Sequence, residues 1–374
     1  MSRLLRENNY NLCLISLTAS HYRKLIYSLM EEQLDCDFFF GESPTTVKQL
    51  DLGLFKTARR TPLIPIGDGY WYRMPLVVRE TKNYEIIIDD MGILCLSSWL
   101  LLLVSKIRRQ KVYLWSHGWY GREGIVKKWM KRAYSALASG MFIYGNYAKD
   151  LMIANGFNSN KLYVIHNSLD YDHQLEVRHK IKETNIFRDH FGNDNPVIIF
   201  IGRLTKVKKL DILLDAISIL KGKGEFYNLL LVGEGETREE LEYQVIENDL
   251  VTQTWFYGEC YDEGVNAELI YNSSVCVAPG NVGLTAMHTM MFGCPVISHN
   301  DFKWQMPEFE AIKSGTTGDF FTKDNCNSLA ETISGWFLAH QRNREDVRKA
   351  CYQEIDSNWN PHRQIELIKT VIGK

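Results

Sequence analysis

Short apolar runs rich in β-branched and aromatic side chains recur along the 374-residue chain and alternate with segments of helical periodicity. Continuous apolar strands that alternate with amphipathic helices are typical of parallel sheets covered by helices on both faces. The pattern therefore predicts an α/β protein. The runs are LCLISL, EIIID, KVYLWSH, MFIYG and LYVIHN before residue 170, and VIIFIGR, NLLLVGEG, TWFYGE, SVCVAP and PVISHN after residue 195.

The alternation breaks once, at a polar, charged stretch without strand signals between about residues 169 and 195. This break predicts two doubly wound, Rossmann-like domains that face a central cleft. We expect them over residues 1–170 and 196–358, joined by an interdomain linker over 171–195. A helix over 359–374 is expected to cross back to the first domain. In such sheets ligands bind beyond the carboxyl ends of the strands, so the loops after each strand are the candidate sites.

Composition narrows the class of protein. Charged residues make up 24% of the chain and the net charge is −2, which gives no global reason to expect a nucleic acid partner. The eight cysteines are scattered without a C-x-x-C pair, which indicates a reducing cytoplasm and no zinc site. The N-terminus lacks the pattern of a signal peptide. The apolar stretch over 93–104 is shorter than the roughly 20 residues that span a bilayer, and is expected to be a buried core helix.

The loop after VIIFIG carries several cations, among them Arg203 and Lys208. A planar guanidinium and a point-charge ammonium together suit an anionic ligand. The alternative is a solvated helix start, but basic residues in a first helical turn oppose the helix dipole. We therefore interpret this loop as an anion site.

The stretch APGNVGLTAMH, residues 278–288, predicts a strand end, a tight loop and a helix that begins near Leu284 or Thr285. Gly283 permits close approach of the backbone, and the free N–H groups at a helix N-terminus bind anions. A plain βα turn is the alternative. Together with Arg203 and Lys208, the loop indicates a site for a diphosphate.

Four stretches of the C-terminal half resemble, in order and spacing, the retaining, nucleotide-sugar-dependent glycosyltransferases of the GT-B fold, in particular glycosyltransferase family 4. They are GRLTKVKKLDILLDA, NLLLVGEGETREELE, VGLTAMHTMMFGCPVISHND and MPEFEAIKSGTTGDFF. The resemblance implies that Arg203 and Lys208 stabilise the charge that grows on the leaving nucleoside diphosphate, without a metal. It also implies a donor-binding set of Gly202, Gly233, Glu234, Gly280, Asn281, Val282, Gly283, Leu284, Thr285 and His288.

The chain departs from the family at one point. The family carries two glutamates separated by seven residues, the first near the sugar and the second near the ribose, and here Gly280 and His288 stand in their place. His288 can still offer a ring nitrogen to a ribose hydroxyl, or it is a packed core histidine. Gly280 offers only backbone, so we expect Asn281 and its neighbours to contact the donor sugar.

The N-terminal half matches the family less closely. The loop in WSHGWYGREG implies that His117 contacts the transferred sugar and that Tyr120 lies beside it. The loop after the first strand is expected to place Ser20, His21 and Arg23 near the acceptor or a phosphate. Asn167 matches a family position at the end of the last N-terminal strand. For His117 and Asn167, local structural roles are the alternative.

From Lys106 to Arg132 there are nine basic residues and one acid, interleaved with tryptophans. IVKKWMKRAYSAL reads as a basic amphipathic helix, which suits an anionic membrane surface. A solvated helix face beside an aromatic core is the alternative. The localisation expected is cytoplasmic, with peripheral association at the inner face of the membrane.

The resemblance implies a retaining, metal-independent hexosyltransferase without cofactor. Its donor would be a UDP- or GDP-sugar, and its acceptor a saccharide or a lipid-linked saccharide in surface polysaccharide biosynthesis. Two alternatives stay open. One is a retaining GT-B enzyme with a small soluble acceptor, such as a phosphorylase or a disaccharide synthase. The other is a degenerate, non-catalytic relative that still binds nucleotide.

Overall fold

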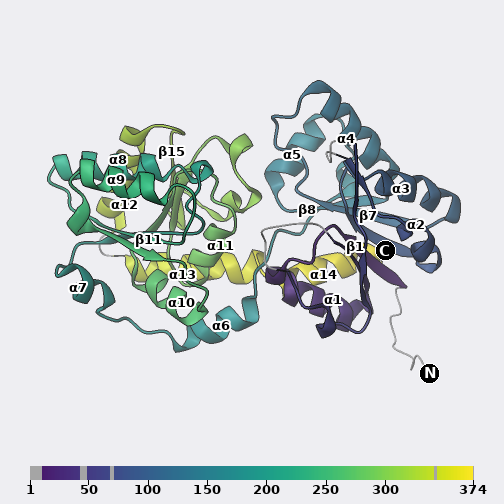
Figure 1. Cartoon of the computed structure of the whole chain (residues 1–374), viewed down its shortest axis with the longest axis horizontal. Coiled ribbons are helices and arrows are strands. Elements are labelled where there is room, and N and C mark those ends of the chain that lie inside the picture. The colour runs from purple at the N-terminus through teal and green to yellow at the C-terminus, as the bar shows by residue number, and fades with distance from the viewer. Residues whose placement is uncertain (1–10, 43–48, 68–70, 341–342, 374) are drawn as a thin grey trace. The chain divides into compact units, whose positions relative to one another are not determined.

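The computed structural model describes residues 11–42, 49–67, 71–340 and 343–373. It divides the chain into two compact units, Met1–Asp170 with Asn360–Lys374 and Tyr171–Trp359. Each unit is built around a parallel sheet with helices on both faces (Figure 1). The predicted α/β fold of two Rossmann-like domains is confirmed.

The sheet of unit 1 has seven strands in the order β3-β2-β1-β6-β7-β8-β9, all parallel. A separate antiparallel pair, β4 and β5, follows β3. The strands are β1 (Leu12–Ser16), β2 (Asp37–Gly41), β3 (Ala58–Thr61), β4 (Ile64–Ile66), β5 (Trp71–Arg73), β6 (Ile86–Asp90), β7 (Lys111–Ser116), β8 (Gly140–Ile143) and β9 (Leu162–Val164). The helices are α1 (Lys24–Leu34), α2 (Val77–Glu80), α3 (Leu96–Arg108), α4 (Ile125–Leu137), α5 (Asn146–Ala154) and α14 (Pro361–Ile372).

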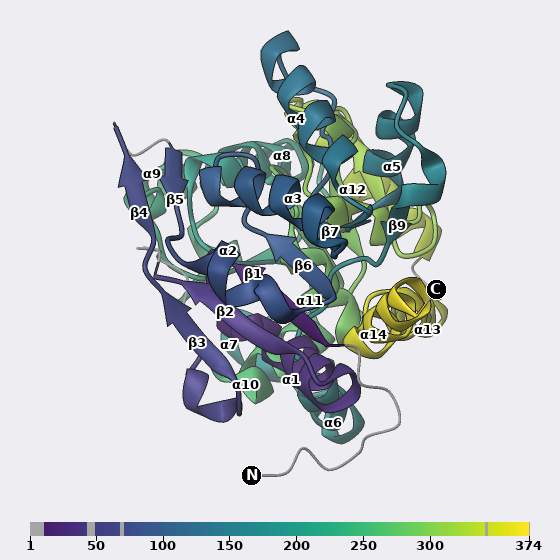
Figure 2. The ribbon, with the colours of Figure 1, turned by 90° about the vertical axis from the view of Figure 1, so that its right-hand side faces the viewer.

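Both faces of this sheet are buried, which explains why its strands are continuously apolar. Leu12 and Leu14 of β1 belong to one core, while Cys13 and Ile15 belong to the other, as the two-residue period of a strand requires. The first core is closed by α1 and α14, and the second by α2 to α5 (Figure 2). The end of the chain is therefore part of unit 1.

The sheet of unit 2 has six parallel strands in the order β12-β11-β10-β13-β14-β15. They are β10 (Val197–Ile201), β11 (Asn228–Val232), β12 (Thr254–Gly258), β13 (Val275–Ala278), β14 (Val296–His299) and β15 (Gly318–Phe321). The helices are α6 (Tyr171–Lys180), α7 (Ile186–Phe191), α8 (Leu210–Gly222), α9 (Arg238–Glu247), α10 (Glu263–Asn272), α11 (Leu284–Met291), α12 (Cys326–His340) and α13 (Arg344–Asn358).

Residues 171–195, expected as a linker, form α6 and α7 and count with unit 2. The stretch lacks strand signals because it is helical, and its polar side chains attach it to the rest of the unit. Gln174 donates a hydrogen bond to Glu263 (2.8 Å), and the Arg178 guanidinium pairs with both oxygens of Asp356 (3.0 and 2.8 Å). Polarity along this stretch thus marks packed helices rather than a free connection.

The strand order reverses direction once in each sheet, between β1 and β6 in unit 1 and between β10 and β13 in unit 2. At such a switch point the loops leave the carboxyl ends of two adjacent strands in opposite directions and open a crevice. In unit 2 these loops are 202–209 and 279–283. In unit 1 they follow Ser16 and Asp90. Arg203 and Lys208 lie in the first loop of unit 2 and Gly280 to Gly283 in the second, while in unit 1 Ser20, His21 and Arg23 follow β1.

Candidate active site

The loop after β10 in unit 2 holds Arg203 and Lys208 and is fastened to the loop after β11. Gly202 donates a backbone hydrogen bond to Val232, and Leu204 donates one to Glu234 (both 2.9 Å). A Cβ on Gly233 would lie 2.0 Å from the carbonyl oxygen of Gly202, so only glycine allows this approach. The Glu234 carboxylate forms an ion pair with Arg238 on α9. Glu234, expected in the donor set, thus has its carboxylate engaged within the loop.

The loop after β13 is seated on the loop that carries Lys208. The Gly280 amide donates to the carbonyl of Lys208 (2.9 Å), and a Cβ on Gly280 would lie 2.0 Å from the carbonyl oxygen of Val207. No side chain fits there without displacing backbone. The acid that the family carries at this position is therefore excluded by packing, and the glycine is a requirement of how the two loops meet.

Lys208 lies against the residue that follows this glycine. Its Nζ donates to the backbone carbonyl and to Oδ1 of Asn281 (2.8 and 2.9 Å). Burial, and then the nearby Arg203, lower the pKa of Lys208 to about 8, although the buried carboxylate of Glu308 acts in the opposite direction. An anion that displaced Asn281 would gain a cation that is held in place and poorly solvated.

The loop then turns into α11 through a strained glycine. Gly283 has φ 53° and ψ −149°, a conformation that side chains rarely adopt. No acceptor among the described residues takes the amide hydrogens of Gly283, Leu284 or Thr285. These three amides open α11, where the helix dipole favours negative charge. These free donors follow the strand next to the one that carries Arg203 and Lys208, and the binding of an anion here stays a prediction.

The Val282 amide, expected in the donor set, does not belong to it. Val282 is fully buried, and its N–H donates to Oε1 of Gln305 (2.9 Å). The Gln305 amide nitrogen donates in turn to Ser298 and to the carbonyl of His299 (2.8 and 3.0 Å). Gln305 therefore fixes the loop after β13 by joining it to the end of β14. No pattern in the sequence predicts this contact, because it joins residues 23 positions apart.

His288 lies one helical turn beyond Leu284. Its side chain is partly buried, and it makes a polar contact rather than packing only against apolar side chains. Its Nε2 lies 3.0 Å from Oε1 of Glu263, at the start of α10, and Gln174 donates to the same oxygen. Although burial opposes it, the His288 contact lowers the pKa of Glu263, which stays ionised. A carboxylate is thus present beside the position where the family carries its second glutamate, but it comes from another helix.

In unit 1 the loops at the switch point bring Arg23 and Asp90 together. The Arg23 guanidinium pairs with Oδ2 of Asp90 (3.0 Å), donates to the Tyr144 hydroxyl and lies 5.5 Å from the ring centre of Trp115. Ser16 donates to the same Asp90 oxygen (3.0 Å). Arg23, expected to face acceptor or phosphate, is therefore already neutralised. Sequence reasoning missed Asp90, whose position at the end of β6 was the available signal.

His117 follows β7 and packs 4.9 Å from Tyr144 and 6.1 Å from Tyr120, measured between ring centres. Burial, and then the cations of Arg23 and Lys131, lower the pKa of His117 to about 4. The ring is therefore neutral at pH 7. Its Nδ1 is buried without a hydrogen-bond partner among the residues that the structure describes. A neutral imidazole with one unused nitrogen can accept or donate a single hydrogen bond to a ligand hydroxyl.

The remaining residues expected to bind the acceptor are Ser20, His21 and Asn167. Ser20 is buried and its hydroxyl lies 3.4 Å from that of Thr18, whereas His21 is exposed. Asn167 is buried, and its Oδ1 accepts the amide hydrogen of Ser168 (3.0 Å). The structure thus brings Arg23, His117 and Tyr120 into one neighbourhood around Tyr144 and Lys131, and it gives Ser20 and Asn167 local structural contacts.

Comparison with known proteins agrees with the family resemblance and with the fold. Residues 181–354 match the family "Glycosyl transferases group 1". An "Uncharacterized 41.2 kDa protein in cps region" of Klebsiella pneumoniae is 26% identical over 250 residues, which cover 62% of this chain and 62% of that protein. The chain thus spans less than two thirds of the length of this curated relative.

Solved structures show the same fold over almost the whole chain. Anabaena Alr3699/HepE in complex with UDP has a TM-score of 0.72 at 16% identity, covering 97% of this chain and 100% of that one. The lipopolysaccharide outer core galactosyltransferase WaaB has a TM-score of 0.70 at 13% identity, covering 97% and 99%. The resemblance inferred from the four sequence motifs is confirmed: residues 181–354 match the group 1 glycosyl transferases, and the chain as a whole has the GT-B fold.

Proposed function

We propose that the protein is a retaining glycosyltransferase that moves a hexose from a nucleoside diphosphate donor to a saccharide or lipid-linked saccharide during surface polysaccharide assembly. The observation that carries the proposal is the candidate anion site at the switch point of unit 2. There, Arg203 and Lys208 follow β10, and the amides of Gly283, Leu284 and Thr285, which have no acceptor among the described residues, follow the adjacent strand β13. The UDP bound by HepE favours uracil as the base of the donor.

In this proposal the bond between the anomeric carbon and the β-phosphate oxygen breaks as the acceptor hydroxyl forms a new bond on the same face of the sugar. The acceptor proton passes to the departing phosphate oxygen. Arg203, Lys208 and the α11 amides stabilise the charge that grows on the diphosphate, and Lys208 is oriented in advance by its hydrogen bonds to Asn281. In the proposal, two cations and a helix N-terminus supply this stabilisation without a metal.

The sugar end of the donor meets backbone and Asn281 rather than a carboxylate, since Gly280 excludes a side chain. The family resemblance implies a contact between His117 and the transferred sugar, and the proposal keeps this role for His117. The neutral state of His117 suits this role, because an uncharged imidazole neither attracts nor repels the oxocarbenium-like sugar.

In the proposal, His288 and Glu263 together bind the ribose of the donor. A diphosphate at the start of α11 places its nucleoside about one helical turn away, roughly 5 Å, which is the position of His288 along the helix. One oxygen of Glu263 is engaged by His288 and Gln174, while its other oxygen has no partner among the described residues. Carboxylate and imidazole together match a vicinal diol.

The first experiment uses donor hydrolysis and transfer as readouts. Arg203→Ala and Lys208→Ala are expected to lower kcat at least 100-fold, the usual loss when one stabilising group is removed from a charged transition state. The matched control is Lys206→Ala, whose ammonium is exposed and faces Glu240. Undiminished turnover in both site variants would overturn the diphosphate assignment. Tight UDP binding without turnover on any acceptor would instead favour the non-catalytic relative.

The second experiment separates ribose recognition from diphosphate binding. UDP and 2′-deoxy-UDP are titrated into wild type and Glu263→Gln. Wild type is expected to bind UDP about tenfold more tightly, and the variant is expected to lose most of this preference, because one charged hydrogen bond is at stake. Equal preference in both proteins would assign Glu263 a structural role only.

We further propose that unit 1 associates with the inner face of the membrane. The stretch over 93–104 is not the buried helix that the sequence indicated: Leu96, Leu100, Leu103 and Ile107 form an exposed stripe along α3. On the neighbouring α4, Ile125, Val126 and Trp129 are 78%, 74% and 68% exposed. Exposed cations, including Arg108, Arg122 and Lys127, flank these apolar faces. No helix among the described residues is long and apolar enough to cross a membrane.

Such a surface suits a bilayer whose headgroups are anionic, because apolar side chains enter the interface while cations remain at headgroup level. Co-sedimentation with phosphatidylcholine vesicles, with and without phosphatidylglycerol, tests it. Trp129→Glu and Leu100→Glu are expected to abolish the binding to anionic vesicles. Leu338→Glu, at a residue 76% exposed in unit 2, is the control. Binding that ignores lipid charge, or that survives both substitutions, would contradict the proposal.

A further inference from the structure

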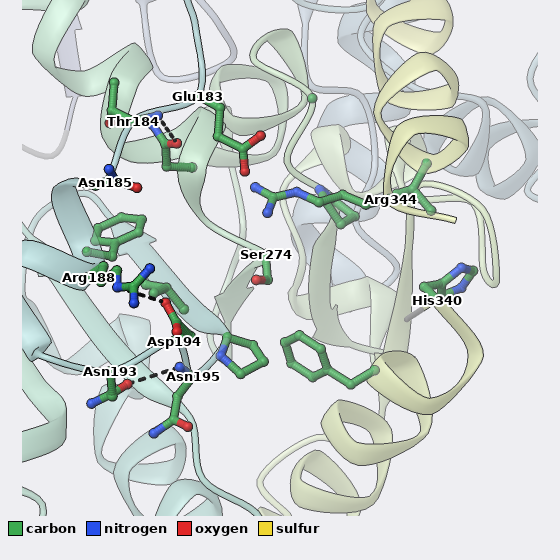
Figure 3. A pocket seen from close by; sticks show the side chains of 18 of the residues that line it. Glu183, Thr184, Asn185, Arg188, Asn193, Asp194, Asn195, Ser274, His340 and Arg344 are labelled. Carbon is green, nitrogen blue, oxygen red and sulfur yellow. Dashed lines mark hydrogen bonds and ion pairs between the residues drawn. The ribbon is translucent and has the colours of Figure 1, made fainter. Parts of the chain in front are cut away.

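Unit 2 contains a cavity at the amino ends of its strands, away from the loops of the candidate active site. It has a volume of about 430 Å³ and opens beside the amino ends of β10, β13 and β14. Its walls come from the loops before these strands and from α7, α12 and α13 (Figure 3). The volume falls in the range of small-molecule sites. Because the donor loops leave the carboxyl ends of the strands, a ligand here would not compete with the donor.

Hydrogen bonds made by residues of the cavity walls hold these walls in place. The Asn272 amide accepts from the Thr184 N–H (2.9 Å) and donates to the Thr184 hydroxyl (3.2 Å). The Asn193 amide oxygen accepts from the N–H of Asn195 (3.0 Å) and from the Asn228 amide (2.8 Å). These contacts fix the two segments, 183–188 and 193–197, that face each other in Figure 3. The cavity is therefore preformed.

The charges in its lining are compensated, which argues against an ion as the ligand. Arg188 pairs with Asp194 at 3.5 Å. Nη2 of Arg344 donates to the carbonyls of Tyr271 and Ser273 (2.8 and 3.1 Å), at the C-terminus of α10, where the helix dipole is negative. Glu183 faces Arg344 across the mouth (Figure 3) and contributes to its electrostatics. No charge is left in excess.

Besides these paired charges, the cavity is lined by neutral polar side chains and by apolar side chains. The Ser274 hydroxyl and the side-chain amides of Asn185 and Asn195 line the cavity, and none has a hydrogen-bond partner among the described residues. Pro295 and Phe337 add apolar surface. Amides and hydroxyls that can both donate and accept, set beside apolar rings, match a ligand with many hydroxyls on one side and C–H groups on the other.

We propose that this cavity binds a neutral saccharide at a distance from the reaction. The choice of a saccharide among neutral polyhydroxylated ligands rests on the proposed glycosyltransferase function. The site would retain a glycan, or report its presence, while the donor loops are occupied. Its affinity would be in the millimolar range that a few neutral hydrogen bonds support.

The test is ligand-observed NMR of the full chain with lactose, maltotriose and N,N′-diacetylchitobiose, each with and without UDP. At least one sugar is expected to bind in both conditions. Ser274→Trp, which fills the cavity, is expected to weaken that binding at least tenfold. Asn185→Ala, at an exposed residue whose side chain has no described partner, is expected to weaken it several-fold without a folding defect. Asn160→Ala, exposed in unit 1, is the matched control.

Three results would overturn the proposal: no binding by any of the three sugars, binding that both cavity variants leave unchanged, or binding that UDP abolishes. If inorganic phosphate binds to the wild type and this binding is lost in Ser274→Trp, the cavity is an anion site instead. A parallel UDP titration separates the two hypotheses. Intact UDP binding without saccharide binding refutes the cavity site alone, whereas saccharide binding without UDP binding refutes the proposed function alone.

Discussion

At the scale of single residues, Lys208 gives the protein a characteristic pH dependence. Its pKa of about 8 is set by burial and by Arg203, so the ammonium loses its proton within an accessible range. Diphosphate binding favours the charged form. UDP affinity is therefore expected to be flat below pH 8 and to fall by up to tenfold per pH unit above it. Terminal phosphates are fully ionised there, so the ligand contributes no slope.

Calorimetric titration between pH 6.5 and 9.5 measures this dependence. In Lys208→Ala, binding should be weaker and independent of pH above 8. An ordinary lysine, with a pKa near 10.4, would keep wild-type affinity constant up to about pH 9.5. Wild-type and variant curves of the same shape would show that Lys208 does not contact the diphosphate.

Gly280 is the second residue with a measurable consequence. Because a Cβ there would lie 2.0 Å from the Val207 carbonyl oxygen, Gly280→Ala is expected to destabilise unit 2 by about 1–3 kcal/mol and to weaken UDP binding. Gly335→Ala, in α12 with open space around it, should instead stabilise by about 0.5–1 kcal/mol. Denaturant titration compares the two. A neutral Gly280→Ala would contradict the packing of the two loops.

At the scale of elements, α14 completes unit 1 although it lies at the end of the chain. Ile365, Ile368 and Ile372 belong to the core beneath β1, and Gln364 accepts a hydrogen bond from Ser168 (2.6 Å). Ile368→Ala, at a fully buried position, is expected to cost about 2–5 kcal/mol of unfolding free energy. Ile107→Ala, 84% exposed in the same unit, should change it by less than about 0.5 kcal/mol.

Hydrogen exchange resolves this effect by unit. In Ile368→Ala the amides of β1 and β6 should exchange faster, while those of β10 and β13 should keep their protection. Faster exchange confined to unit 2, or unchanged exchange in β1, would show that α14 is not part of the core of unit 1.

The apolar runs of the sequence identified most of the central strands and also the edge strands β9 and β12, LYV and TWFYG. The central strand β2, DFFFG, is not among these runs. The edge strands β3 and β15, ARRT and GDFF, carry polar residues and gave no such signal. The polar stretch 171–195, expected as a linker, is helical and counts with unit 2. Polarity alone does not distinguish a free connection from helices attached by side-chain hydrogen bonds.

At the scale of the whole molecule, the parts of the site that the sequence located are those that topology determines. Arg203, Lys208 and the 280–285 loop follow adjacent strands at a switch point, so their proximity could be inferred from strand order. Asp90, which ends β6 at the switch point of unit 1, could have been found in the same way. Gln305 and Glu263 could not, because each acts through a side-chain contact with a distant segment. The roles of the individual site residues stay predictions.

The central claim is that the switch point of unit 2 binds a nucleoside diphosphate, and thermal unfolding of the full chain tests it most directly. UDP, GDP, ADP and inorganic phosphate are compared without metal and then with Mg²⁺. One nucleoside diphosphate at 100 times its dissociation constant is expected to add about 2.7 kcal/mol of stability without metal, and to have no effect on Lys208→Ala at the same concentration. No stabilisation of the wild type by any of these ligands would contradict the account.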